Sequence, residues 1–87
     1  KVFSSGLIAS KVNWVSLSPP KGPIRVTAKI RYGAPEAEAI LFPGEGGRVR
    51  VEFDEPQRAV TPGQGVVFYW GEEVAGGGTI ENSLAAV

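Results

Sequence analysis

The clearest pattern in the chain is the strict alternation of apolar and polar residues over Ile24–Tyr32. A period of two over nine residues predicts a β-strand with one buried face and one face in water. Arg48–Phe53 repeats the pattern and predicts a second strand of this kind. The inward members of the first are Ile24, Val26, Ala28, Ile30 and Tyr32, and the outward members are Arg25, Thr27, Lys29 and Arg31.

Four further strands follow from composition, and short loops rich in Gly and Pro separate them. In Glu36–Phe42, Pro35 before the segment and Pro43 after it leave too little room for a stable helix. The four segments are Gly6–Trp14, Glu36–Phe42, Val66–Trp70 and Val74–Ile80. The turns between strands are expected at Ser16–Pro23, Gly33–Pro35, Pro43–Gly47, Asp54–Gln57, Thr61–Gln64 and Gly71–Glu73.

The turn Thr61–Gln64 has the residues of a type II turn, with Pro62 at its second position and Gly63 at its third. Pro favours the φ of the second position, and the third requires a positive φ that suits Gly. We therefore expect Gln64 to be held in a fixed place at the rim of the domain. In the strand that follows, Val66, Phe68 and Trp70 are interpreted as packing residues, with Tyr69 on the opposite face.

Six short strands without a convincing helix predict an all-β domain, either a sandwich or a barrel. We expect a small, closed, six-stranded barrel, rich in antiparallel pairs, because closure removes the exposed edges that so small a domain can hardly protect. The expected bounds are 1–5 for a linker or ragged N-terminus, 6–82 for the barrel and 83–87 for a C-terminal tail.

The composition restricts the chemistry of the 87 residues, which contain no Cys and no His. Disulfides, thiolate nucleophiles and zinc–thiolate sites are excluded, and the commonest general base is missing. There is no Met even at position 1, so the simplest interpretation is a piece of a longer protein. A processed secreted protein is the alternative, but no signal-peptide pattern is present.

Charge is distributed unevenly although the net charge is zero. Residues 1–35 carry six Lys and Arg and no acid, whereas residues 36–87 carry three Arg and nine acids. Arg25, Lys29 and Arg31 lie on the outward face of one strand, where residues two apart are separated by about 6.5–7 Å. That face fits a nucleic-acid backbone, but a solvated face, or two halves that neutralise each other, explains it equally simply.

No constellation of residues in the chain indicates a self-sufficient active site. The acidic pairs Asp54-Glu55 and Glu72-Glu73 are interpreted as solvated turn residues, because neighbours on a strand point to opposite faces. Gly76–Gly78 lacks the Lys-Ser/Thr and the helix of a phosphate loop, and indicates close backbone approach or a bulge. Phe68, Tyr69 and Trp70 could stack on bases, but a core position is the simpler interpretation of Phe68 and Trp70.

Taken in order, several short motifs resemble the C-terminal domain of bacterial tRNA-specific 2-thiouridylase over about residues 12–81. The motifs are Val12-Asn13-Trp14, Lys29-Ile30-Arg31-Tyr32, Phe53 followed by Pro62-Gly63-Gln64, Val67-Phe68-Tyr69 and Gly76-Gly77-Gly78-Thr79-Ile80. The resemblance implies a six-stranded barrel similar to the second domain of translation elongation factors. It also implies tRNA contacts for Arg31, Tyr32 and Gln64, with Arg25 and Lys29 as weaker candidates from the basic strand face.

The same resemblance implies that the longer protein is a cytoplasmic tRNA-uridine 2-sulfurtransferase that uses ATP to thiolate the wobble uridine at C2. The barrel itself is then non-catalytic and holds no cofactor or metal, while ATP binds in the catalytic domain. Its expected partners are tRNA and the catalytic and central domains of the same chain, with no membrane. The alternative is a structural barrel that packs on neighbouring domains and contacts RNA little.

Overall fold

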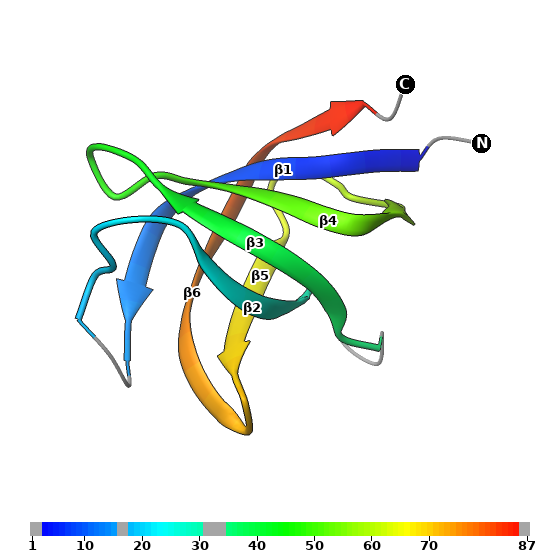
Figure 1. Ribbon diagram of the computed structural model, residues 1–87. Helices are drawn as coiled ribbons and strands as arrows, with labels where there is room; N and C mark the ends of the chain where they lie inside the picture. The colour runs from blue at the N-terminus through cyan, green and yellow to red at the C-terminus, as the bar shows by residue number, and fades with distance from the viewer. Residues whose placement is uncertain (1–2, 16–17, 31–34, 86–87) are drawn as a thin grey trace.

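The computed structural model describes residues 3–15, 18–30 and 35–85, which form six antiparallel strands (Figure 1). Their order around the sheet is β1-β4-β3-β2-β5-β6, and the sheet closes into a barrel. The prediction of an all-β, six-stranded closed barrel is therefore confirmed. The strands are β1 (Phe3–Trp14), β2 (Ile24–Lys29), β3 (Ala37–Pro43), β4 (Val49–Arg58), β5 (Gly65–Trp70) and β6 (Glu73–Ala85).

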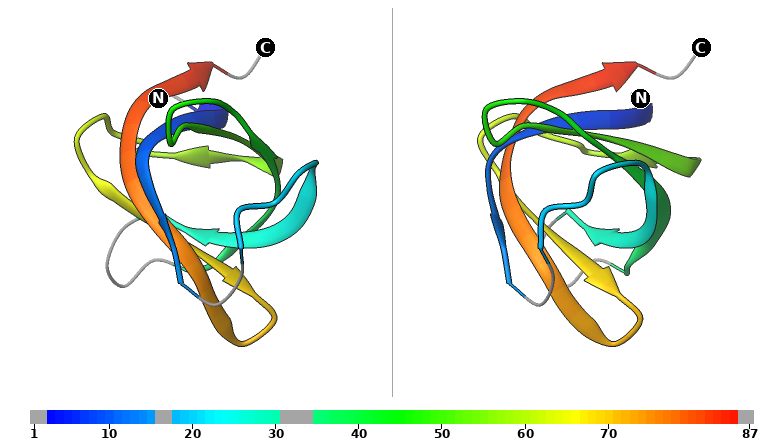
Figure 2. Two further views of the ribbon diagram at one scale, coloured as in Figure 1. Left: turned by 90° about the vertical axis from the view of Figure 1, so that its left-hand side faces the viewer. Right: turned by 60° about the vertical axis from the view of Figure 1, so that its left-hand side comes forward.

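The strands enclose one apolar interior, and the two views of Figure 2 show them curving around it. Val26 and Ala28 of β2 are buried, while Arg25, which points to the opposite face of the strand, is exposed, as the alternation predicts. The largest side chains that are fully buried are Phe68, Leu7, Leu41, Ile80, Val51 and Val66. Within the described residues, no helix is long and apolar enough to cross a membrane.

Strands β1 and β6 approach each other so closely that two positions on β6 admit only glycine. A Cβ atom added to Gly76 would lie 2.5 Å from the carbonyl oxygen of Asn13, and one added to Gly78 would lie 2.7 Å from that of Ser10. The β1–β6 register also shifts between Ser10 and Asn13. The interpretation of Gly76–Gly78 as a place of close backbone approach is confirmed, because a Cβ atom added to any of the three would lie 2.5–2.9 Å from a carbonyl oxygen of a neighbouring strand.

The turn expected at Asp54–Gln57 is wrong, because these residues continue strand β4 to Arg58. After Phe53, β4 no longer pairs with β3 and continues along the start of β1, where Ser4 is opposite Gln57. Ser4 is also opposite Ala85 of β6, and it is buried at 3% exposure. The barrel strands thus extend past the expected bounds of 6–82, to Phe3 at one end and Ala85 at the other.

The assignment of Trp70 to the core is also wrong. Phe68 is fully buried, as expected, but Trp70 is 56% exposed. The β5–β6 register shifts between Phe68 and Tyr69, and Trp70 is the last residue of β5. Alternation still directs its side chain away from that of Tyr69, but the barrel interior no longer continues at this end of the strand.

Candidate nucleic-acid interface

The turn that carries Gln64 has the geometry that its sequence predicts. Gly63 has a φ of 95°, and the amide of Gln64 donates a hydrogen bond of 3.2 Å to the carbonyl oxygen of Thr61. Two further bonds fasten the turn to β6, because the amide of Gly63 donates to the carbonyl of Ile80 and the amide of Ile80 donates to that of Gln64. These bonds fix the backbone of Gln64, although Gln64 itself is exposed to solvent.

Lys29 lies at the same end of the β2–β5 pair as this turn. It is opposite Val67 in the antiparallel register, three positions after Gln64, and it is half-buried. The described structure therefore brings together Gln64 and one of the weaker basic candidates. Arg31 and Tyr32 lie outside the described residues, so their assignment to the interface stays a prediction.

Arg25, the other weaker candidate, is engaged by acids of two neighbouring strands. Its Nη1 atom donates a hydrogen bond of 2.9 Å to Asp54 and lies 3.6 Å from a carboxylate oxygen of Glu38. The hydrogen bond with Asp54 is the largest cause of the raised pKa of Arg25. All three side chains are about half exposed or more, so water and salt screen these pairs. The outward face of β2 is therefore partly neutralised by the acidic half of the chain.

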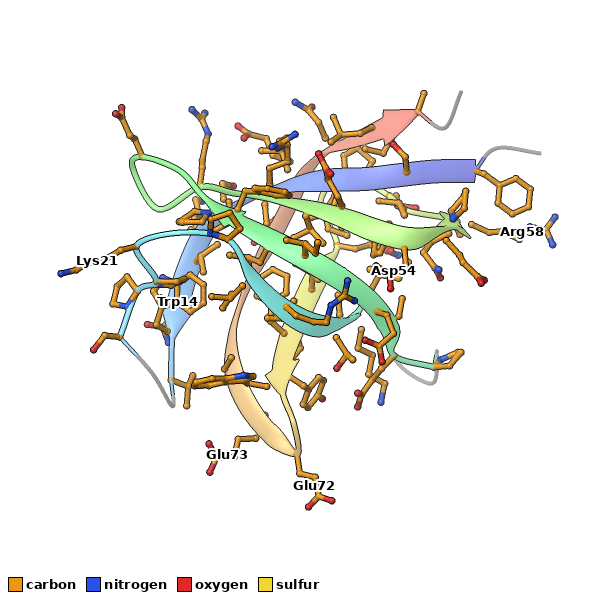
Figure 3. All side chains as sticks on the ribbon, viewed as in Figure 1. Trp14, Lys21, Asp54, Arg58, Glu72 and Glu73 are labelled. Carbon is orange, nitrogen blue, oxygen red and sulfur yellow. The ribbon has the colours of Figure 1, made fainter. Side chains whose placement is uncertain are left out.

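An acidic hollow of about 370 Å³ borders this face, between the end of β4 and the start of β3. Asp54, which Figure 3 labels, belongs to its lining. Because Ala28 is opposite Ala37, this hollow lies at the Lys29 end of the β2–β3 pair, and a polyanion that approached Lys29 from the β3 side would be repelled. The full lining is Pro35, Glu36, Ala37, Glu38, Asp54, Glu55 and Gln57.

Two arginines of the β3–β4 region, which sequence reasoning did not single out, are also paired with acids. Arg48 makes a two-pronged contact with Glu81, with N–O distances of 2.9 and 3.0 Å. Arg50 pairs with Glu52 and lies over the ring of Phe42, 4.3 Å from its centroid. The Arg48-Val49-Arg50 alternation was the available signal. Arg50 and Glu52 are two positions apart on β4 and so share a face, whereas the pairing of Arg48 with Glu81 depends on strand pairing.

The acidic pairs form no catalytic dyad. Asp54 binds Arg25 from within β4, while Glu72 and Glu73 project at the tip of the β5–β6 hairpin (Figure 3). Among the described residues, no group of three or more His, Cys, Asp or Glu could hold a metal ion. The triple glycine is occupied by contacts with neighbouring strands, so it does not fit a nucleotide phosphate.

Comparison with known proteins agrees with the motif order. The family described as "Aminomethyltransferase beta-barrel domain" matches residues 4–80. The chain is 53% identical over 84 residues to the tRNA-specific 2-thiouridylase MnmA of Halothermothrix orenii, covering 97% of this chain and 24% of that protein. It is 56% identical over 81 residues to the MnmA of Acetivibrio thermocellus, covering 93% of this chain and 23% of that protein.

The similarity therefore extends over nearly the whole barrel, whereas the chain spans about a quarter of the length of these relatives. The resemblance to the barrel domain of tRNA-specific 2-thiouridylases is confirmed. The chain belongs to the aminomethyltransferase beta-barrel domain family, in the form found in tRNA-specific 2-thiouridylases.

Proposed function

We propose that this barrel is a tRNA-binding accessory domain of a tRNA 2-thiouridylase. The observation that carries the proposal is the similarity of nearly the whole chain to part of proteins named tRNA-specific 2-thiouridylases. In this proposal the longer protein thiolates the wobble uridine at C2 in an ATP-dependent reaction. ATP and the reacting groups belong to its catalytic domain, and the barrel contributes binding without chemistry.

Gln64 is the central contact in the described part of the proposed interface. Its amide both donates and accepts hydrogen bonds, so it suits a phosphate, a 2′-hydroxyl or a base edge. Because the backbone of the turn is tied to Ile80, ordering Gln64 on RNA costs little backbone entropy. Lys29 supplies a positive charge at the same end of the strand pair. Arg31 and Tyr32 complete the proposed set.

The proposed partners are tRNA and the catalytic and central domains of the same longer chain. In this proposal the protein is cytoplasmic. Electrostatic contact from one barrel is weak by itself, because each neutralised phosphate contributes only a slope of about 0.7–0.9 to the dependence of log affinity on log salt concentration. The barrel then acts by adding contacts to those of the other domains.

The test is the Arg31→Ala variant of the full-length protein, measured for tRNA affinity at several salt concentrations. We expect lower affinity and a salt slope that is smaller by about 0.7–0.9. Arg48→Ala is the matched control, since Arg48 is already paired with Glu81. If the Arg31 variant binds tRNA with unchanged affinity and unchanged slope, its assigned role is wrong.

A structural barrel that contacts RNA little is the second candidate, and the pairing of Arg25 with Asp54 and Glu38 favours it. Hydrogen exchange of the full-length protein with and without tRNA separates the two. Protection over residues 24–32 and 61–64 that appears only with tRNA excludes a purely structural role. Equal exchange in both states would support it.

A further inference from the structure

Exposed large hydrophobic residues gather at one end of the barrel. Trp70 is 56% exposed, Val74 40% and Val15 64%. The amide of Val15 donates a hydrogen bond of 2.8 Å to the carbonyl oxygen of Ala75, so the end of β1 lies against the start of β6. Trp70 is opposite Glu73 and Val74 is opposite Tyr69, so the side chains of Trp70 and Val74 lie on opposite faces of the hairpin. We call Trp70, together with the neighbouring Glu72 and Glu73, the tip patch. Phe3 is the other exposed large hydrophobic among the described residues, and the guanidinium of Arg58 lies over its ring.

The hairpin holds Trp70 in place through paired strands. Trp70 is opposite Glu73, which leaves only Gly71 and Glu72 in the loop, and Gly71 has a φ of 67°. Two-residue hairpin loops favour positive φ values because this twist matches that of the strands. Rigidly held, exposed aromatic residues are typical of contact surfaces, where Trp contributes much of the binding energy at little cost in ordering.

The charge at the tip selects the kind of partner. Glu72 and Glu73 are both exposed and project from the hairpin (Figure 3), and residues 70–75 include no cation. Two carboxylates beside Trp70 repel the phosphates that accompany a stacked base, which disfavours RNA as the occupant. They complement instead a protein surface in which an apolar pocket is bordered by Lys or Arg.

We propose that the tip patch docks on an apolar, basic-bordered surface elsewhere in the same longer polypeptide. The proposal rests on the proposed function, in which the barrel works inside a 2-thiouridylase. The curated relatives are about four times as long as the matched segment, so most of the polypeptide is available as the partner. Trp70 and Gln64 flank the two ends of β5, about 20 Å apart by strand rise, so docking leaves Gln64 accessible.

The test uses the full-length protein without tRNA, with the photo-crosslinking residue p-benzoylphenylalanine in place of Trp70. The matched control carries it in place of Glu45, which is exposed in the turn between β3 and β4. We expect crosslinks within one polypeptide, to residues outside the barrel, from position 70 and not from position 45. The combined substitutions Glu72→Lys and Glu73→Lys should lower the yield, because they reverse the charge that meets the basic border.

Crosslinks only between two copies of the protein, or a yield at position 70 no higher than at position 45, would overturn the proposal. Crosslinks formed only to added tRNA would overturn it as well and assign Trp70 to RNA stacking. If the position-70 variant does not fold, the same residue is placed at Glu73, which is opposite Trp70 in the hairpin. The crosslinking is done without tRNA, so it tests the docking alone. The proposed function is tested separately, by the tRNA affinity of the Arg31 variant.

Discussion

The amide of Ile80 donates a hydrogen bond of 2.7 Å to the carbonyl oxygen of Gln64, and this bond ties the exposed turn to the middle of β6. The neighbouring bond from Gly63 to the carbonyl of Ile80, at 2.8 Å, closes the connection from the other side. The two bonds therefore fix the backbone position from which the Gln64 side chain extends.

Gly63→Ala should destabilise the barrel by about 1–2 kcal/mol, because a residue with a Cβ atom is strained at positive φ. Gly63 has a φ of 95° and no heavy atom near its absent Cβ, so strain and not a clash is the cause. Urea unfolding of the domain measures the change. Gly22→Ala is the control, since Gly22 also has free space but no positive φ, and a loss of equal size there would contradict the explanation.

Gln64→Ala should weaken tRNA binding by the longer protein and leave the stability of the domain within about 0.5 kcal/mol of wild type. The amide side chain is exposed, and the turn is held by backbone bonds that the substitution retains. Binding titrations with tRNA measure the effect. Gln57→Ala, at the far end of β4, removes the same side chain elsewhere, and an equal loss of affinity in that variant would argue against a specific contact.

Arg25→Ala should change the salt dependence of tRNA binding less than Lys29→Ala does. Arg25 is held by Asp54 and Glu38, whereas Lys29 lies at the Gln64 end of the strand pair. A cation already matched with carboxylates releases fewer counterions from RNA. Affinities measured across a salt series give both slopes. A larger change in slope for the Arg25 variant would contradict this prediction and show that Arg25 leaves its acidic partners to contact RNA.

Gly76→Ala should destabilise the barrel by about 3 kcal/mol, at the upper end of the range for overpacking. Its Cβ would lie 2.5 Å from the carbonyl oxygen of Asn13, and a backbone atom cannot move aside as a flexible side chain does. Thermal or urea unfolding tests this. Gly65→Ala provides the comparison, because the nearest atom there is 3.8 Å away, and similar losses at both positions would rule out close strand approach as the cause.

Phe68→Ala should cost about 3–5 kcal/mol, whereas Trp70→Ala should change the stability of the isolated domain by about 0.5 kcal/mol or less. The two residues are two positions apart on β5, but one is fully buried and the other is 56% exposed. Unfolding midpoints of the two variants give the comparison directly. A large loss for the Trp70 variant would mean that this side chain supports the core after all.

Much of the fold was predictable because its signals are local. The alternation around Val26 and Ala28 and the Pro62-Gly63 turn each determine their own conformation, and both expectations are confirmed. The continuation of β4 through Asp54 was not predictable in this way. Asp, Glu and Pro favour turns by local preference, but here pairing with the start of β1 prevails over that preference.

The interface was harder to predict from the sequence, because the charged residues of one strand do not show which residues of other strands pack beside them. Arg25 appeared as a free cation because Asp54 lies 29 positions away in the chain and meets it only through the strand order. Trp70 was misplaced for a related reason, because alternation gives the direction of a side chain but not where the barrel interior ends. Gln64 could be found, since its turn is defined by adjacent residues.

The close contact of β1 with β6 has a consequence for the way in which the barrel forms. Ser4 is opposite Ala85 and Trp14 is opposite Gly76, so the first and last strands of the described chain are partners along most of their length. The ring of strands cannot close until the final strand is available. Domains dominated by such distant pairings fold in roughly milliseconds to seconds. During synthesis on the ribosome, the edges of β1 and β5 therefore stay unpaired until β6 has emerged.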